Sequence, residues 1–138
     1  MTEIIQNIYI KENSTVARIY NYLNSQGSEK LFIYKDFESC GTYGNLRSAI
    51  QTLCVLGVLE SVHRGVYMRK YSNTSFPEDI QIAKELGRRN GDSVWYYKEK
   101  IVNGTRYLYV HTSGSSRTVT LKSGTVVKFI FKLNKKNV

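Results

Sequence analysis

The chain has 138 residues, of which 41% are hydrophobic and 22% are charged, as in an ordinary globular protein rather than a disordered or fibrous one. This length is sufficient to fold without disulfides or metal, as one compact unit or as two joined lobes. No apolar run approaches the roughly 20 residues of a membrane span, and no basic region followed by an apolar stretch opens the chain. We therefore expect a cytoplasmic protein whose two cysteines, Cys40 and Cys54, stay reduced.

Charge is distributed unevenly along the chain. The net charge is +9, but residues 1–60 contain 5 Lys/Arg against 6 Asp/Glu, whereas residues 61–138 contain 15 against 5. Such a basic half favours a polyanionic partner such as DNA, RNA or an acidic protein. A high pI also occurs in basic proteins that bind no polyanion, so the charge alone does not establish such a partner.

Apolar periodicity predicts two main helices in the first half of the chain. Two sets of apolar residues recur at i, i+3, i+4 and i+7, namely Val16, Ile19, Tyr20 and Leu23, then Leu46, Ala49, Ile50 and Leu53. They predict an amphipathic helix over 14–23, with Asn13 or Ser14 as its N-cap, and a second one that starts at Thr42 and has Gly57 as its C-terminal stop. Residues 35–39 between them are long enough for one or two helical turns.

Three β-prone runs, 31–34, 58–62 and 66–69, accompany these helices. The second and third flank His63-Arg64-Gly65 and therefore predict a hairpin. Its tip and far arm carry basic residues, namely Arg64, Arg69 and Lys70. Two helices joined by a short helix and a turn, then a basic hairpin, are the elements of a winged helix-turn-helix, which we predict for residues 1–70.

The second half predicts a smaller α+β lobe. Residues 71–76 are polar and irregular and form the predicted boundary. Pro77 suits the first position of a helix that runs to Arg89, with acidic residues at its start and basic residues at its end. Four alternating segments then predict a small antiparallel sheet, over 94–101, 105–112, 119–121 and 126–132. The predicted fold class is thus α+β, a winged helix-turn-helix followed by a helix and a small antiparallel β-sheet lobe at 76–134.

The helix over 42–57 carries the candidate DNA-reading residues. In a helix-turn-helix the second helix of the pair enters the major groove. Side chains beside or opposite its apolar stripe suit base edges, because Gln and Asn bond adenine, Arg bonds guanine, and Ser bonds a base or a phosphate; they are Asn45, Arg47, Ser48 and Gln51. Thr42 and Tyr43 near the helix start are phosphate candidates. The plainer interpretation is the solvated face of an amphipathic helix.

The hairpin supplies the remaining candidates. Arg64 and Lys70 can neutralise phosphates, or Arg64 can enter a minor groove, although edge-strand charges that prevent aggregation are the alternative. His63 is ambiguous. Because His63 and His111 are the only histidines and have no carboxylate or cysteine at ligand spacing, we expect no metal site. The chain also lacks the common catalytic motifs, so we expect neither an enzyme nor a cofactor.

Eleven tyrosines are present, several of them among basic residues in 95–98 and 106–109. Rings between cations can stack on unpaired bases, as in single-strand binders. Alternate tyrosines that pack one face of a sheet are the simpler explanation. The segment 114–117 likewise predicts either a phosphate-binding loop of N–H groups or a plain hairpin turn.

The segment from Leu46 to Tyr67, LRSAIQTLCVLGVLESVHRGVY, resembles the helix-plus-wing signature of the abortive-infection (AbiEi-like) type IV antitoxins. In that signature a helix ends in leucine, two or three residues, glycine, an apolar residue and leucine, and the wing closes with Arg-Gly-Val-Tyr. Phe76-Pro77, Arg88–Gly91 and Tyr107–Val119 resemble the second lobe of short relatives, so the likeness spans about residues 14–132.

This resemblance implies a prokaryotic or phage regulator, often an autorepressor that binds repeats in its own promoter. In some systems such proteins also counter a nucleotidyltransferase toxin. The DNA-contacting region of the family falls here on Thr42–Gln51 and on His63, Arg64 and Tyr67.

The sequence thus predicts a double-stranded DNA-binding transcriptional regulator, an antitoxin-like autorepressor. We expect a homodimer, because two-fold symmetry matches palindromic sites. The alternative is a protein-interaction module, an antitoxin or mobile-element inhibitor that uses its basic face against a toxin, another protein or a nucleoprotein complex. A third hypothesis is single-stranded RNA binding through the tyrosine-rich sheet.

Overall fold

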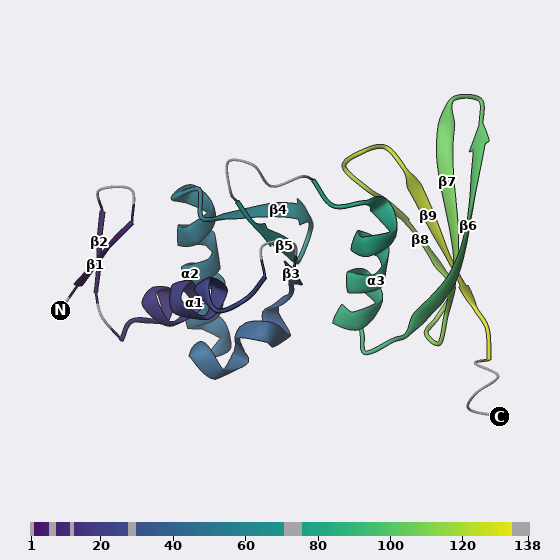
Figure 1. Ribbon diagram of the computed structural model, residues 1–138. Helices are drawn as coiled ribbons and strands as arrows, with labels where there is room; N and C mark the ends of the chain where they lie inside the picture. The colour runs from purple at the N-terminus through teal and green to yellow at the C-terminus, as the bar shows by residue number, and fades with distance from the viewer. Residues whose placement is uncertain (1, 6–7, 12, 28–29, 71–75, 134–138) are drawn as a thin grey trace. The chain divides into compact units, whose positions relative to one another are not determined.

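The polypeptide folds as two units, residues 1–76 and 77–138 (Figure 1). The computed structural model describes residues 2–5, 8–11, 13–27, 30–70 and 76–133. The predicted boundary at 71–76, apart from Phe76, and Asn134 at the end of the predicted second lobe lie outside these residues. Within the described ranges, no helix is long and apolar enough to cross a bilayer.

The first unit combines helices with two small sheets. Its elements in chain order are β1 (Thr2–Ile5), β2 (Ile8–Lys11), α1 (Thr15–Asn24), β3 (Leu31–Phe32), the 3-10 helix η1 (Tyr34–Cys40), α2 (Tyr43–Val55), β4 (Leu59–His63) and β5 (Val66–Arg69). The predicted helices and hairpin are all present, which confirms the α+β class. The antiparallel pair β1–β2 was not predicted from the patterning.

Local signals explain where α1 and α2 begin and end. The Ser14 hydroxyl accepts the Ala17 N–H at 3.1 Å, so Ser14 is the N-cap of α1. After α2, Gly57 adopts φ +77°, and the Val58 N–H donates to the Leu53 carbonyl at 2.9 Å. This left-handed glycine ends α2 where the sequence predicts its stop.

Aromatic packing holds the short helix η1 in the core of the first unit. The Phe32 and Phe37 rings stack with centroids 5.6 Å apart, and Tyr22 meets both rings edge-on. The same core contains the apolar stripes of the two long helices, including Ala17, Ile19, Leu23, Leu46, Ala49, Ile50 and Leu53. Because 3-10 helices have little stability of their own, the position of η1 depends on Phe37.

The hairpin of the first unit belongs to a three-stranded sheet of order β3-β5-β4. Both pairings are antiparallel. Arg64 and Gly65 form the turn between β4 and β5, and Gly65 adopts φ +81°, which glycine tolerates without strain. The predicted hairpin is therefore confirmed, and it pairs directly with the strand that follows α1.

The second unit places one helix against a four-stranded sheet. Its elements are α3 (Asp79–Arg89), β6 (Val94–Val102), β7 (Thr105–Thr112), β8 (Arg117–Thr120) and β9 (Val126–Phe131). The helix begins two residues after the predicted Pro77, because Glu78 is the N-cap and its N–H donates to Gln81 Oε1 at 2.8 Å. The apolar side of α3 is buried, and the helix packs tightly on the sheet at Gly87, where an added Cβ would lie 2.6 Å from Val94 Cγ2.

The prediction of an antiparallel sheet is wrong for one pairing. The strand order is β6-β7-β9-β8, and β7 runs parallel to β9 (Figure 1). In β9 the side chains of Val127 and Phe129 are buried, whereas no residue of β8 is buried. The apolar strand therefore takes the inner position and the polar strand takes the edge. Turn composition predicts hairpins between successive strands, so it does not reveal that β9 lies between β7 and β8.

Candidate nucleic-acid interface

The candidate residues of α2 lie on its exposed side. Its apolar stripe is buried, with Leu46 at 3%, Ile50 at 1% and Leu53 at 0% exposure. A stripe anchored in this way fixes the rotation of the helix about its axis. The predicted polar residues are consequently all exposed, namely Thr42, Tyr43, Asn45, Arg47, Ser48 and Gln51.

The start of α2 is open to an approaching ligand. Thr42 is the N-cap, and its side chain makes no capping hydrogen bond. A Cβ atom added to Gly44 would meet no atom within 4 Å. The N–H groups of the first turn of a helix lack partners within the helix and attract anions. The predicted role of Thr42 and Tyr43 near phosphate is compatible with this geometry.

Three tyrosine rings connect α2, η1 and β5. Tyr34 lies 5.6 Å from Tyr43 and 6.2 Å from Tyr67, measured between ring centroids. Burial of the Tyr67 phenol, assisted by Tyr34, raises its pKa above the ordinary value, while Arg47 acts in the opposite direction. Tyr67 is therefore a neutral, half-buried support beside Arg47 rather than an open contact. The contribution of Tyr34 to this cluster was not predicted, because in the sequence Tyr34 is only the last residue of the β-prone run 31–34.

The hairpin separates the basic residues that the sequence places near one another. Arg64 is exposed in the turn, and His63 beside it is half-buried. Lys70 lies at the other end of β5, where its N–H donates to the Val58 carbonyl at 2.9 Å. Six extended residues span about 20 Å. The structure thus brings His63 and Arg64 together at the tip, but it does not bring Lys70 to them.

Lys70 also has an acidic neighbour. Its Nζ atom lies 4.0 Å from Glu60 Oε1, and the two side chains are 59% and 41% exposed. An ion pair this exposed contributes little to stability, but the carboxylate reduces the local positive charge. Lys70 is therefore a weaker phosphate candidate than Arg64.

A shallow hollow of about 350 Å³ lies along the second half of α2. It is lined by Ser48, Gln51, Thr52, Val55 and Leu56. Val55 is 81% exposed, and an exposed apolar side chain beside polar ones can contact a thymine methyl group or a partner protein. The hollow therefore extends the candidate surface beyond Gln51.

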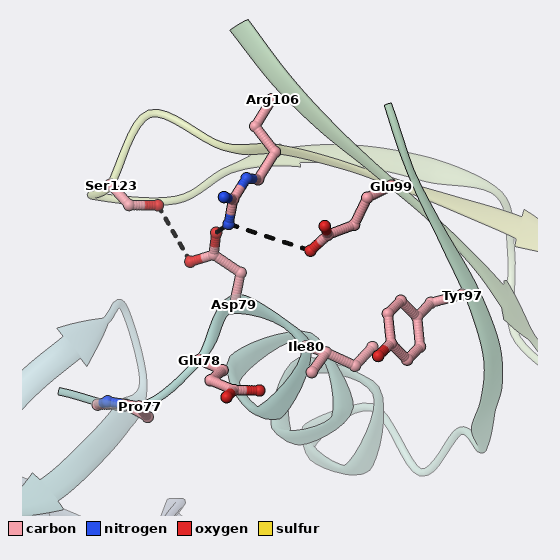
Figure 2. Close-up of a pocket in the computed structure, with 8 residues that line it drawn as sticks. All are labelled: Pro77, Glu78, Asp79, Ile80, Tyr97, Glu99, Arg106 and Ser123. Carbon is pink, nitrogen blue, oxygen red and sulfur yellow. Dashed lines mark hydrogen bonds and ion pairs between the residues drawn. The ribbon is translucent and has the colours of Figure 1, made fainter. Parts of the chain in front are cut away.

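The second unit has a pocket of about 480 Å³ at the start of α3 (Figure 2). Asp79 accepts hydrogen bonds from Thr125 Oγ1 at 2.6 Å and from Ser123 Oγ at 3.1 Å. An Arg106 nitrogen lies 3.8 Å from Asp79 and 4.0 Å from Glu99. Glu78 also lines the pocket, so the lining contains three carboxylates and one guanidinium. Its net charge is negative and would repel a phosphate. We interpret it as a structural network.

The Asp79 network gives a stability prediction. Asp79→Ala removes two hydrogen bonds to a carboxylate that is 13% exposed, so the second unit should lose about 1.5–3 kcal/mol of unfolding free energy. Denaturant unfolding followed by fluorescence of Trp95, the only tryptophan, measures this. Glu99→Ala is the matched control, because Glu99 is 53% exposed and should change stability by about 0.5 kcal/mol or less. Equal losses in the two variants would contradict the interpretation.

The segment 114–117 is not arranged for phosphate. Arg117 at its end lies 3.8 Å from Asp92 and 4.2 Å from the Phe129 ring. The Asp92 carboxylate also occupies the space against Gly114. A carboxylate in this position repels an anion, so the phosphate alternative is disfavoured. Because β7 and β8 are not paired, the segment is a connection to the edge strand rather than a hairpin turn.

The described residues include no group of three or more His, Cys, Asp or Glu side chains placed to hold a metal ion. No protein-family model, curated protein or solved structure matches this chain.

Proposed function

We propose that the first unit is a winged helix that binds double-stranded DNA, with α2 in the major groove and the β4–β5 hairpin as the wing. The order of elements supports this, because α1, η1 and α2 precede the hairpin as in winged helix-turn-helix proteins. The pairing of β3 with β5 supports it further, since it ties the hairpin to the segment between α1 and η1.

The observation that carries the proposal is the composition of the exposed side of α2. Arg47 and Gln51 are four residues apart and so lie on the same face of the helix. Both are exposed, and their side chains suit guanine and adenine edges respectively. The buried stripe beneath them gives the rigid support that base readout requires.

The biological role that fits is a cytoplasmic transcriptional regulator, in keeping with the antitoxin-like motifs around Leu46–Tyr67. An autorepressor that binds its own promoter as a homodimer is the specific form we favour. Sedimentation of the protein with and without its DNA measures the dimer, and a monomer in both samples would contradict it.

The test is binding to labelled duplex from upstream of the protein's own gene, against a scrambled duplex of the same length, across a salt series. We expect a preference of about a thousandfold or more for the native duplex at physiological salt. Equal affinities with a steep dependence on salt would contradict the proposal, because they would indicate phosphate attraction alone.

A protein-interaction module is the second candidate, favoured by the hollow around Val55 on the same helix. Here the partner is a toxin or another protein. Two results together would favour this function over the first. The protein would bind such a partner tightly and lose that binding in Val55→Glu, and it would show no preference between the two duplexes.

A further inference from the structure

The sheet of the second unit has one covered face and one open face. Side chains that alternate toward α3 are buried, including Leu108, Val110, Val127 and Phe129. The opposite side chains of the same strands form what we call the open face, and none of them is fully buried. Its characteristic members are Trp95, Lys98, Lys100, Tyr107, Tyr109 and Lys128.

Strand register places lysines beside the two tyrosines of β7. Across β6 and β7, Tyr109 is opposite Lys98, and Tyr107 is opposite Lys100. On the other side, Lys128 of β9 is in register with Tyr109, and its Nζ atom lies 5.6 Å from the centre of the Tyr107 ring. Opposite residues on adjacent strands have Cβ atoms about 5 Å apart, so Tyr109 has a lysine beside it on each adjacent strand. Tyr107 is in register with Lys100 on one side and with Val126 on the other, and Lys128 approaches its ring diagonally.

The rings themselves form a short track. Tyr107 and Tyr109 are half-buried, and their rings stack with centroids 6.3 Å apart. Further along the same face, Trp95 is 39% exposed and lies 6.2 Å from the His111 ring. Three aromatic side chains thus follow the sheet, and none of them is covered by α3.

The open face has a single sign of charge. Among its side chains that the structure describes, which excludes Tyr96, there is no carboxylate. Glu99 and Arg106, which are close to these residues in the sequence, point to the other face and pair with each other. Lysines beside half-buried rings therefore present positive charge and stacking surfaces together.

We propose that this open face binds single-stranded nucleic acid, with bases stacked on Tyr107, Tyr109 and Trp95 and the backbone held by Lys98, Lys100 and Lys128. Aromatic rings in a positively charged track are the chemistry by which proteins hold unpaired bases. A duplex hides the faces of its bases, so the rings would have no stacking role in duplex binding. This surface is separate from the one proposed to bind duplex DNA.

Trp95 makes the test specific to this face, because it is the only tryptophan in the chain. The probes are labelled 15-nucleotide oligo-dT and oligo-U, a 15-base-pair duplex of random sequence, and heparin. We expect either single strand to bind about tenfold or more tightly than the duplex and to quench Trp95 fluorescence. Heparin binding should depend less than single-strand binding on the tyrosine rings of the open face.

Single substitutions distinguish the contribution of ring stacking to binding from the contribution of positive charge. Tyr107→Ala and Tyr109→Ala should each weaken single-strand binding about fivefold to hundredfold, while Tyr→Phe at either position keeps it near that of the wild type. Tyr97→Ala is the matched control, since Tyr97 is 49% exposed but lies in the pocket on the opposite face (Figure 2). Lys98→Ala and Lys100→Ala, both at exposed positions, should each lower the salt slope by about 0.7, and Lys84→Ala on α3 should not change it.

Three results would overturn the inference. They are equal binding of single strand and duplex, tyrosine variants that bind like Tyr97→Ala, and single-strand binding that disappears when Arg47 and Gln51 are replaced. The preference for the native duplex can be absent while single-strand binding by the open face is present, and the reverse also holds. The two tests therefore distinguish this inference from the function proposed for the first unit.

Discussion

Replacing Arg47 and Gln51 together with alanine is expected to lower affinity for the native upstream duplex by about 30-fold to 10,000-fold, because each good base contact contributes about 1–3 kcal/mol of discrimination. Affinity for scrambled DNA should fall much less, since only one cation is removed from the phosphate attraction. Both side chains are exposed on α2, so the fold should be unaffected. Titration of both duplexes at one salt concentration measures the ratio.

Lys84→Ala is the control for loss of charge alone. Lys84 is exposed on α3 in the second unit, and its removal should change the two duplex affinities by the same small factor. A double variant that keeps the preference for the native duplex would show that α2 does not read the bases. An equal loss of affinity for both duplexes would indicate that Arg47 contacts phosphate and not a base.

Phe37→Ala should destabilise the first unit by about 3–5 kcal/mol, as for other buried phenylalanines. Phe37 has 0% exposure and stacks on Phe32, so its removal leaves a cavity beneath η1. Such a loss is a large part of the roughly 5–15 kcal/mol of a typical domain. Far-UV circular dichroism with denaturant should show the first unit unfolding early, while Trp95 reports the second unit unchanged.

Val55→Ala is the control for this stability prediction. Val55 is apolar but 81% exposed, and its truncation should change the unfolding free energy by about 0.5 kcal/mol or less. Similar destabilisation in the two variants would mean that η1 is not held by the aromatic core. Phe37→Ala should also weaken duplex binding indirectly, since η1 directly precedes α2.

The helices were predictable because their signals are local. The apolar spacing that places Leu46, Ile50 and Leu53 on one stripe also determines which side of α2 is exposed, so the candidate residues from Thr42 to Gln51 follow from periodicity. Hairpin turns are also local, and the two β-prone runs on either side of Gly65 predicted one. Each of these elements depends on residues within a few positions of one another.

Strand order and cross-strand neighbours could not be predicted in this way. The insertion of β9 between β7 and β8 depends on which strand buries its side chains best, which is a property of the assembled sheet. Tyr34 acquires its role from rings that are distant in the sequence. Tyr97 and Arg106 face away from Lys98 and Tyr107 because side chains alternate along a strand. Grouping the tyrosines and basic residues of 95–98 and 106–109 by sequence proximity did not separate these two faces.

Amide and side-chain NMR during titration with the native upstream duplex shows whether the exposed side of α2 binds duplex DNA. We expect the shift changes to concentrate on residues 42–52 and on the hairpin tip at 63–65. The resonances of Asp79 and Thr125 in the second unit should shift little. Changes confined to the second unit, with α2 unaffected by saturating duplex, would contradict this expectation.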